Sequence, residues 1–404
     1  MNNYHKHTYY SNLFSMDSIA SYEDYAKRAK ELGHKVLCSV EHGWQSQYFQ
    51  PFSVAKKYGL KFVFGTEAYW VKNRFEKERA AHHIVILARN ENGRQAINDI
   101  LSEANLTGYY YRPRLDINLI MSLPADDVFI TTACVAFWGY EDIEDVVVKL
   151  KKHFKSNFML EIQNHNTEKQ IRLNKYIKKL SHKYNIPMIA GLDSHYIFPE
   201  DAIIRDEALL SKGIRYEDED GWYMDYPSDE ECFARFKRQN IFTDREIQQA
   251  MDNTDILLEF DDYDDLKIFK KDIKLPSLYP DKTQEEKNKI FSRLITRQFK
   301  EYMRDIPEGQ YELYHKAVLA EVNVWRDTGM VDYPLINYKV IKRGVELGGV
   351  ITKSGRGSAV SFITNMLLGF SNVDRLKSTI PLYPDRFMST SRILETKSLP
   401  DKQI

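Results

Sequence analysis

The stretch Pro187–His195, "PMIAGLDSH", joins an apolar run directly to two residues of metal-binding type. The run "PMIAGL" has the length and composition of a buried β-strand. Asp193 and His195 follow it two residues apart, and residues at i and i+2 of an extended chain point to the same face, so both could bind one ion. Before the strand, Glu168–Lys183 repeats apolar residues at a spacing of roughly 3.6, which predicts a helix.

The same alternation of helix and strand continues through the first 200 residues. Helical segments such as Ser21–Leu32 lie between further apolar runs, which are Lys35–Val40, Lys61–Thr66, His83–Ala88, Val128–Thr132 and Asn157–Ile162. Strands that alternate with helices predict an α/β domain with a parallel sheet, either open or closed into a barrel.

Potential metal ligands recur at the ends of these runs. In a barrel the carboxyl ends of the strands meet at one site, and five of the six runs place a ligand there: Glu41, His42, Glu67, Cys134, Glu161, Asp193 and His195. His83 begins its run and fits this rule less well, whereas His5 and His7 form a second i, i+2 pair.

Each of these residues alone has a simpler explanation, such as a solvated carboxylate or a small buried cysteine. Together they exceed what one ion needs and predict a multinuclear site. Mixed nitrogen, oxygen and sulfur ligands suit zinc, iron or manganese. Closely spaced metals of this kind serve phosphoester hydrolysis.

Composition narrows the class of protein. The 404 residues carry 57 basic and 58 acidic side chains, so nucleic acid could bind only to a local basic patch. The three cysteines are too few for a disulfide framework, which indicates a reducing cytoplasm. No apolar run is long enough to cross a membrane, and the N-terminus lacks the layout of a signal peptide.

A second domain is predicted after two prolines, Pro276 and Pro280, which gives domains at 1–270 and 271–404. It begins with two long helices, Thr283–Met303 and Gln310–Thr328, the first with the capping pair of Thr283 and a glutamate three residues later. Farther on, the turn "SGRGS" at 354–358 could bind a polyphosphate, with a helix from residue 359 onward facing the anion, although a glycine turn is also an ordinary connector.

Several motifs resemble, in order and spacing, those of a polymerase and histidinol phosphatase (PHP) domain from bacterial DNA polymerase III alpha subunits. They are "HKHTYYS", "SVEHG", "GTEAYW", "HHIVILARNENG", "TTACVAFWG", "LEIQNH" and "AGLDSHY". The second half, with "YHKAVLAEVNVWRDTGMVDYPLI" and "IPLYPDRFMS", resembles the opening of that subunit's polymerase palm. The resemblance implies a distorted (β/α)7 barrel followed by the mostly helical or mixed start of a palm domain.

The resemblance also implies a trinuclear centre of zinc, manganese or iron. Its ligands would be His5, His7, His42, Glu67, His83, Cys134, Asp193 and His195. Glu41 would orient His42 from outside the ligand set, and Asp17 is the nearest candidate for a further acidic ligand, although it is out of register. A ligand set of this kind goes with 3′–5′ exonuclease activity in the family.

In the second domain the resemblance implies a site for the triphosphate of an incoming dNTP. Its residues would be Gly355, Arg356, Gly357, Ser358 and Arg386. Lys353 and Ser354 stand where the family usually has Gly-Pro, and Lys353 could add a phosphate contact. Asp401 matches the first aspartate of an Asp-x-Asp pattern that holds catalytic magnesium, but Gln403 stands at the second position. One carboxylate cannot assemble a two-metal polymerase site.

We therefore expect the N-terminal fragment of a replicative polymerase, which acts on primer-template DNA and single-stranded 3′ ends together with a complementary polypeptide. A free-standing PHP phosphoesterase and an inactive binding scaffold are the alternatives.

Overall fold

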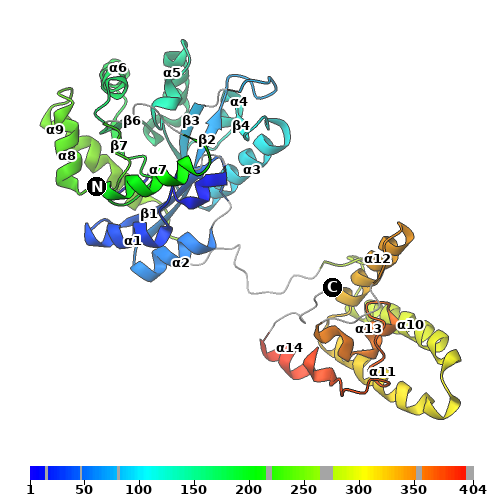
Figure 1. The fold of residues 1–404 in the computed structure, drawn as a ribbon. Coiled ribbons are helices and arrows are strands. Elements are labelled where there is room, and N and C mark those ends of the chain that lie inside the picture. Colours follow the sequence, from blue (N-terminus) through cyan, green and yellow to red (C-terminus); the bar gives the residue numbers. More distant parts are fainter. Residues whose placement is uncertain are drawn as a thin grey trace. The chain divides into compact units, whose positions relative to one another are not determined.

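The computed structural model describes residues 1–13, 17–45, 48–79, 82–214, 221–263, 276–351 and 357–396. The chain divides into two compact units, Met1–Asp264 and Asp265–Ile404 (Figure 1). The boundary predicted between residues 270 and 271 falls outside the described residues.

The first unit is built around one seven-stranded sheet with helices packed against it (Figure 1). Its strands are β1 Val36–His42, β2 Lys61–Trp70, β3 His82–Ala88, β4 Arg114–Leu115, β5 Val128–Thr131, β6 Phe158–Gln163 and β7 Met188–Gly191. Its helices are α1 Tyr22–Glu31, α2 Phe49–Tyr58, α3 Glu91–Thr107, α4 Ile117–Met121, α5 Ile143–Phe154, α6 Glu168–Tyr184, α7 Ala202–Leu210, α8 Asp229–Arg238 and α9 Asp244–Asp252. All six predicted strands are confirmed, and the two-residue β4 was not predicted.

The strands run in the order β1-β2-β3-β5-β6-β7, with β4 beside β2. The prediction of a parallel sheet is wrong for β3, which is antiparallel to both β2 and β5. Adjacent antiparallel strands need no crossover helix, and none lies between β2 and β3 in the described residues, whereas α2 connects the parallel strands β1 and β2. The reversal brings the first residues of β3 to the edge where β2 ends, since His83 lies opposite Tyr69.

The N-terminal segment lies between the end of β7 and β1. Lys6 forms a parallel bridge with Ser194, and the amide of His7 donates to the Ser194 carbonyl at 2.7 Å. The side chain of Lys6 points the other way and donates to the Cys38 carbonyl at 2.7 Å. The predicted i, i+2 geometry is therefore confirmed, because His5 and His7 share the face opposite Lys6.

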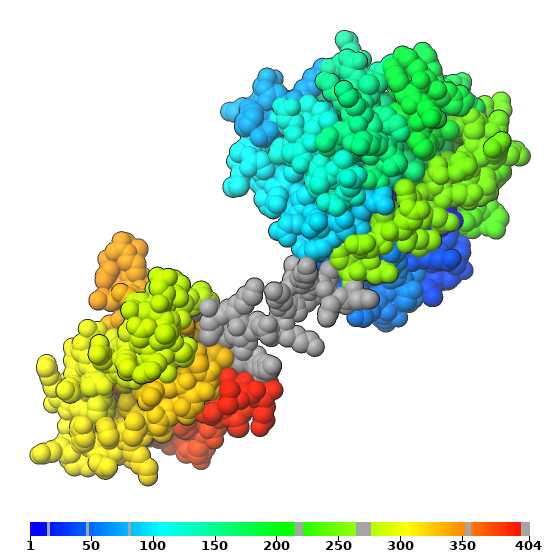
Figure 2. Space-filling view, turned by 180° about the vertical axis from the view of Figure 1, so that it is seen from behind, coloured from blue at the N-terminus to red at the C-terminus, as the bar shows by residue number. Residues whose placement is uncertain are grey.

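Residues 221–263 pack against the N-terminal part of the same unit, and Figure 2 shows the yellow-green residues near 250 beside the blue ones. The amide of Asn2 donates to Thr254 Oγ1 at 2.7 Å, and helix α9 packs on β7. Leu257 and Phe260 complete the core beneath the strands, which is built from alternate strand residues such as Val63 and Val85. This packing fixes the strand ends that carry the candidate ligands.

Among its described residues the second unit contains helices, turns and loops and no strand. Its helices are α10 Gln284–Tyr302, α11 Tyr311–Asp327, α12 Asp332–Glu346, α13 Ile363–Leu367 and α14 Thr390–Thr396. The predicted capping box of Thr283 with Glu286 is present. The core centres on Trp325, whose ring contacts the rings of Phe291, Phe362 and Phe387.

The helix predicted from residue 359 onward is wrong. Residues Ser358–Ser361 form a single 3-10 turn, and the short α13 starts only at Ile363. Phe362 between them is extended and fully buried against Trp325 and Phe387, so its packing interrupts a continuous helix.

Across the part of the chain that the structure describes, every helix is too short or too polar to span a bilayer.

Candidate metal centre

Glu67, near the middle of β2, is the carboxylate around which the candidate site is built. It is fully buried, and each of its oxygens faces two histidines. Oε1 lies 3.2 Å from His5 Nε2 and 3.0 Å from His83 Nδ1, whereas Oε2 lies 3.3 Å from His7 Nε2 and 2.6 Å from His42 Nδ1. Four elements thus meet at one side chain: the N-terminal segment, β1, β2 and β3.

Asp193, just after β7, is the second carboxylate of the cluster. Its Oδ1 lies 3.3 Å from His5 Nε2 and 3.2 Å from His7 Nε2. Its backbone has a φ of 50°, and Ala133, the residue before Cys134, has a φ of 48°. Such left-handed conformations are costly for residues with a side chain and concentrate at functional sites.

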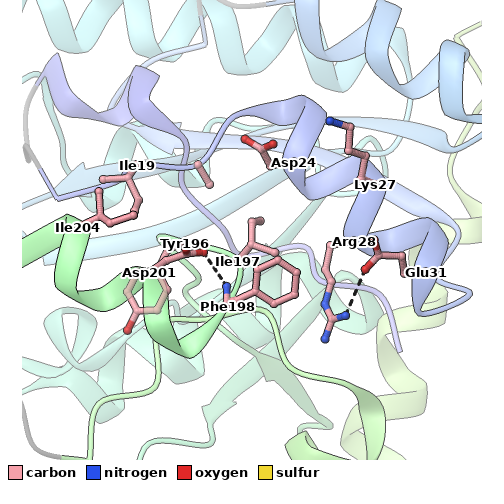
Figure 3. A pocket seen from close by; sticks show the side chains of 11 residues that line it. Ile19, Asp24, Lys27, Arg28, Glu31, Tyr196, Ile197, Phe198, Asp201 and Ile204 are labelled. Carbon is pink, nitrogen blue, oxygen red and sulfur yellow. Dashed lines mark hydrogen bonds and ion pairs between the residues drawn. The ribbon is translucent and has the colours of Figure 1, made fainter.

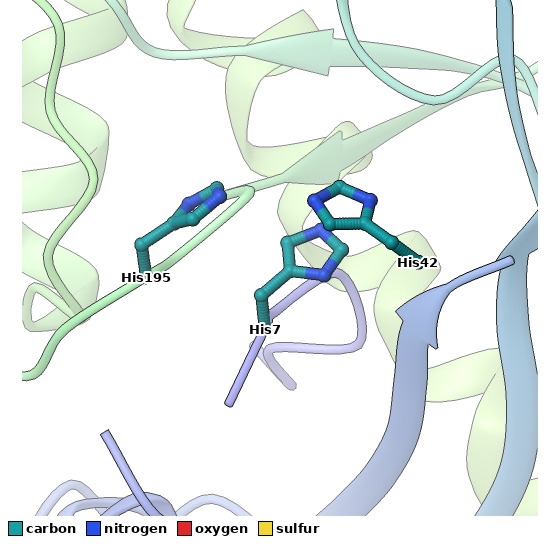
Figure 4. Close-up of side chains that lie close together, drawn as sticks. All are labelled: His7, His42 and His195. Atoms are coloured by element: carbon teal, nitrogen blue, oxygen red, sulfur yellow. The ribbon is translucent and has the colours of Figure 1, made fainter. Parts of the chain in front are cut away.

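The remaining predicted ligands surround these two carboxylates. Three groups bring ligand atoms within 4.8 Å of one another: His7, His42 and His195; His5, His7 and Asp193; and His42, Glu67 and His83. Figure 4 shows the first group, in which the rings of His7 and His42 stack with centroids 3.9 Å apart. Cys134 Sγ lies 3.5 Å from His83 Nδ1 and 3.8 Å from Glu67 Oε1.

Asp17 also reaches the cluster, despite its poor register in the sequence. Its Oδ2 lies 3.5 Å from His195 Nε2. All eight predicted ligands, together with Asp17, therefore converge on one edge of the sheet.

Glu161 on β6 supports His5, a role that the sequence did not reveal. The carboxylate accepts from His5 Nδ1 at 2.7 Å and from the Tyr4 hydroxyl at 2.6 Å. Gly191 on the neighbouring strand makes room for it, because a Cβ there would lie 2.3 Å from the Glu161 carboxyl carbon. Since a carboxylate only accepts hydrogen bonds, His5 carries its proton on Nδ1 and turns the Nε2 lone pair toward the cluster.

Glu41 supports His7 and does not orient His42, contrary to what the resemblance had implied. Its carboxylate accepts from the hydroxyls of Ser11, Thr8 and Tyr22, at 2.5, 2.6 and 2.5 Å. Neighbouring residues of a strand point to opposite faces, so Glu41 and His42 diverge. Ser11 gives its proton to Glu41 and therefore accepts from His7 Nδ1 at 3.0 Å, which leaves the Nε2 lone pair of His7 facing the cluster.

The electrostatics of the cluster call for positive charge. Burial alone would raise the pKa of Glu67, but the surrounding histidines hold it well below the usual range. Burial would lower the pKa of His7, yet hydrogen bonds and charges from Asp193 and Glu67 raise it to about 10. Burial and the neighbouring His7 lower the pKa of His42 to about 4. A single proton on His7 cannot balance the charge of the two carboxylates and the lone pairs of the neighbouring imidazoles.

Unsatisfied atoms show that the residues fit a metal. Within the described residues, six buried atoms of the cluster lie close to one another without a hydrogen bond of good geometry: His5 Nε2, His7 Nε2, His42 Nδ1 and Nε2, Glu67 Oε2 and Asp193 Oδ1. Buried polar atoms are otherwise nearly always paired. Imidazole lone pairs that face carboxylate oxygens at 3.2–3.3 Å repel each other unless a cation lies between them.

A hollow of about 420 Å³ is lined in part by Tyr196, Ile197 and Phe198, which follow His195 in the sequence (Figure 3). Its wall includes Ile19, whose amide donates to the His195 carbonyl at 3.1 Å, and Tyr196. Arg28 from α1 lies over the ring of Phe198, 5.2 Å from its centroid. The hollow gives the neighbourhood of His195 an open face with aromatic and charged groups.

The predicted nucleotide site is only partly described. Lys353, Gly355, Arg356 and Asp401 lie outside the described residues. Gly357 has a φ of 76°, in the left-handed region that favours glycine, and Ser358 begins the 3-10 turn. Arg386 is exposed in a second 3-10 turn, Pro384–Arg386. Their role in binding a triphosphate stays a prediction.

Comparisons with known protein families find a match in each half of the chain. The PHP domain profile matches residues 3–165, and the profile described as bacterial DNA polymerase III alpha NTPase domain matches residues 289–403. The chain thus contains a PHP domain followed by a DNA polymerase III alpha NTPase domain, and it resembles the DNA polymerase III alpha-subunit family.

Curated relatives within this family extend along nearly the whole chain. The DNA polymerase III subunit alpha of Borreliella burgdorferi is 26% identical over 99% of the chain, which corresponds to 34% of that protein. Those of Campylobacter jejuni and Aquifex aeolicus are 25% and 26% identical over 98% of the chain, and 35% of each protein is covered. The chain thus spans about a third of the length of these relatives.

Proposed function

We propose that the first unit of this chain is a metal-dependent phosphoesterase that removes nucleotides from the 3′ end of single-stranded DNA. The single observation that supports the proposal most strongly is the set of six buried atoms around Glu67 and Asp193 that lack a hydrogen bond of good geometry. Three overlapping ligand groups fit a trinuclear centre of zinc, manganese or iron.

The side chains of the site have two roles: some would hold the metals, and others position those ligands. His5, His7, His42, Glu67, His83, Cys134, Asp193 and His195 would hold the metals, with Asp17 beside His195. When bound, the metals would supply a Lewis acid and a hydroxide at neutral pH. Glu161 fixes the tautomer of His5, and Ser11 with Glu41 fixes that of His7.

The test combines metal analysis with a nuclease assay on the purified chain. We expect bound divalent metal and manganese- or zinc-dependent shortening of a single-stranded DNA from its 3′ end. The variants Asp193→Asn and Glu67→Gln should lose both the bound metal and the shortening of DNA. The rate of hydrolysis should fall by more than about a hundredfold, since even residues that only hydrogen-bond to a metal ligand change metal affinity or activity by 10–100-fold. Asp252→Asn, on an exposed turn of α9, is the matched control and should change neither.

The other outcomes separate the alternatives. Hydrolysis of a small phosphate ester without shortening of DNA would indicate a free-standing phosphoesterase. A protein without bound metal or hydrolysis would be a scaffold, and the proposal would be wrong.

The relatives' name suggests a second role for the chain, in DNA synthesis. We propose that the second unit contributes the start of a polymerase palm, with primer-template DNA and dNTPs as substrates of the whole protein and magnesium as its metal. Its match to the polymerase III alpha NTPase domain supports this. The complementary polypeptide expected from the sequence stays a prediction.

A further inference from the structure

Helices α10 and α12 of the second unit line a hollow of about 530 Å³, and its lining includes none of the described residues predicted to bind nucleotide. Each helix contributes four residues at the spacing i, i+3, i+4, i+7, so each presents one continuous stripe. The stripes are Ile290, Arg293, Leu294 and Arg297 on α10, and Leu335, Tyr338, Lys339 and Lys342 on α12, with Leu278 and Tyr279 at one side. We call this hollow the α10–α12 groove.

The four cations of the groove are exposed, and none forms an ion pair with any residue in the described ranges. The other basic residues of the same helices are different. Lys287 pairs with Asp332 at 2.9 Å, Lys289 with Glu285 at 2.7 Å and Arg343 with Glu346 at 3.3 Å. These carboxylates are thus engaged elsewhere, which leaves the groove with concentrated positive charge in a chain whose net charge is only −1.

The interior of the groove is apolar and aromatic. Leu335 is buried, Ile290 and Leu294 are half-buried, and all three pack in the core of the unit. Tyr338 and Tyr279 line the same hollow, and Arg297 donates to the Tyr338 hydroxyl at 3.4 Å. A rim of cations around aromatic side chains is the arrangement with which proteins bind single-stranded nucleic acid, through phosphates and base stacking.

We propose that the α10–α12 groove binds a short single-stranded segment of nucleic acid, with its phosphates on the four cations and a base against Tyr338. Two of the four cations are arginines, whose planar forks bind phosphate oxygens in pairs. Tyrosine rings add a stacking surface that an acidic peptide would not need, and this favours nucleic acid as the occupant. The proposal does not depend on the metal centre, which lies in the other unit.

Fluorescence anisotropy with a labelled dT12 oligonucleotide tests the proposal on the full chain. The measurement is made in EDTA and in an Asp193→Asn background, so that binding at the metal centre does not contribute. The variant R293Q/R297Q/K339Q/K342Q should bind at least tenfold more weakly at low salt. The slope of log K against log[salt] should become shallower by about three in magnitude, since each lost phosphate contact removes about 0.7 from it.

Two pair variants, R293Q/R297Q and K339Q/K342Q, give the same test if the quadruple variant does not fold, and each should reduce the slope by about half as much. Tyr338→Leu should weaken binding of dT12 but leave the slope unchanged, because it removes stacking and no charge. The control K289Q/R343Q changes two paired cations on the same helices and should bind as the parent does. Equal losses in the control and the groove variants, or tighter binding of an oligoglutamate than of dT12, would overturn the proposal.

Discussion

At the scale of single residues, the sequence predicted which candidate ligands would converge better than it predicted which side chains support them. His5, Asp193 and the other candidates could be found because strand ends and i, i+2 pairs follow from backbone geometry alone. Glu161 was visible only as one more strand-end carboxylate. Its role depends on Gly191 on β7 and on Tyr4 in the N-terminal segment, which come together only in the folded unit.

We therefore expect Glu161→Gln to weaken metal binding by about tenfold, the range typical of partners behind a ligand. A glutamine can donate to His5 Nδ1 as well as accept from it, so the tautomer of His5 is no longer fixed. Competition with a metal-sensitive chelator measures the affinity directly. A variant that binds metal as tightly as the parent would show that Glu161 does not position His5.

At the scale of secondary structure, the strands and the long helices followed from apolar periodicity and capping residues. Thr283 caps α10 as predicted, and the helix predicted from Ser21 is present as α1, which Ser21 caps. The direction of β3 did not follow, because hydrophobic runs carry no information about which way a strand runs. The reversal also explains His83, which begins its strand and yet reaches the site.

The contribution of the capping residue Glu246 at the start of helix α9 to stability should depend on pH. Glu246 accepts from the amide of Thr243 at 2.8 Å and from Lys178 on α6, also at 2.8 Å. Partial burial would raise the pKa of Glu246, but these bonds lower it to about 2. A carboxyl with a depressed pKa stabilises the fold above its unfolded pKa of about 4.3, and this stabilisation is lost as the pH falls toward 2.

The parent protein should thus be more stable than Glu246→Gln by about 1 kcal/mol or less near pH 7, because the ion pair is still partly open to solvent, which screens it. The difference should shrink between about pH 5 and pH 2. Urea denaturation at several pH values measures it. Glu259→Gln, at an exposed glutamate without an ion pair in the described ranges, should show no such trend, and a difference that grew on acidification would contradict the assignment.

At the scale of the whole molecule, the two units can be followed separately by fluorescence. Trp325 is the only one of the five tryptophans in the sequence of the second unit, so Trp325→Phe leaves a signal from the first unit alone. A ligand that binds only the folded state at a hundred times its Kd adds about 2.7 kcal/mol. For a unit of this size that corresponds to roughly 5–10 °C in Tm.

We expect manganese or zinc, added to the EDTA-treated Trp325→Phe protein, to raise the fluorescence-detected Tm by that amount. The same addition should have no effect when Asp193→Asn is also present, because the cluster then lacks a carboxylate that faces two histidines. An equal shift in both proteins would mean that the metal stabilises the unit from another position.

The placement of the N-terminal segment between β7 and β1 has a consequence for biosynthesis. His5 and His7 leave the ribosome first, but the backbone that holds them, at Ser194, is translated almost 190 residues later. The nascent chain therefore carries exposed, unpaired histidines until Ser194 has been synthesised, and the centre can close only when the last strand has emerged. Metal loading during translation would thus report that the barrel-forming part of the chain has been completed.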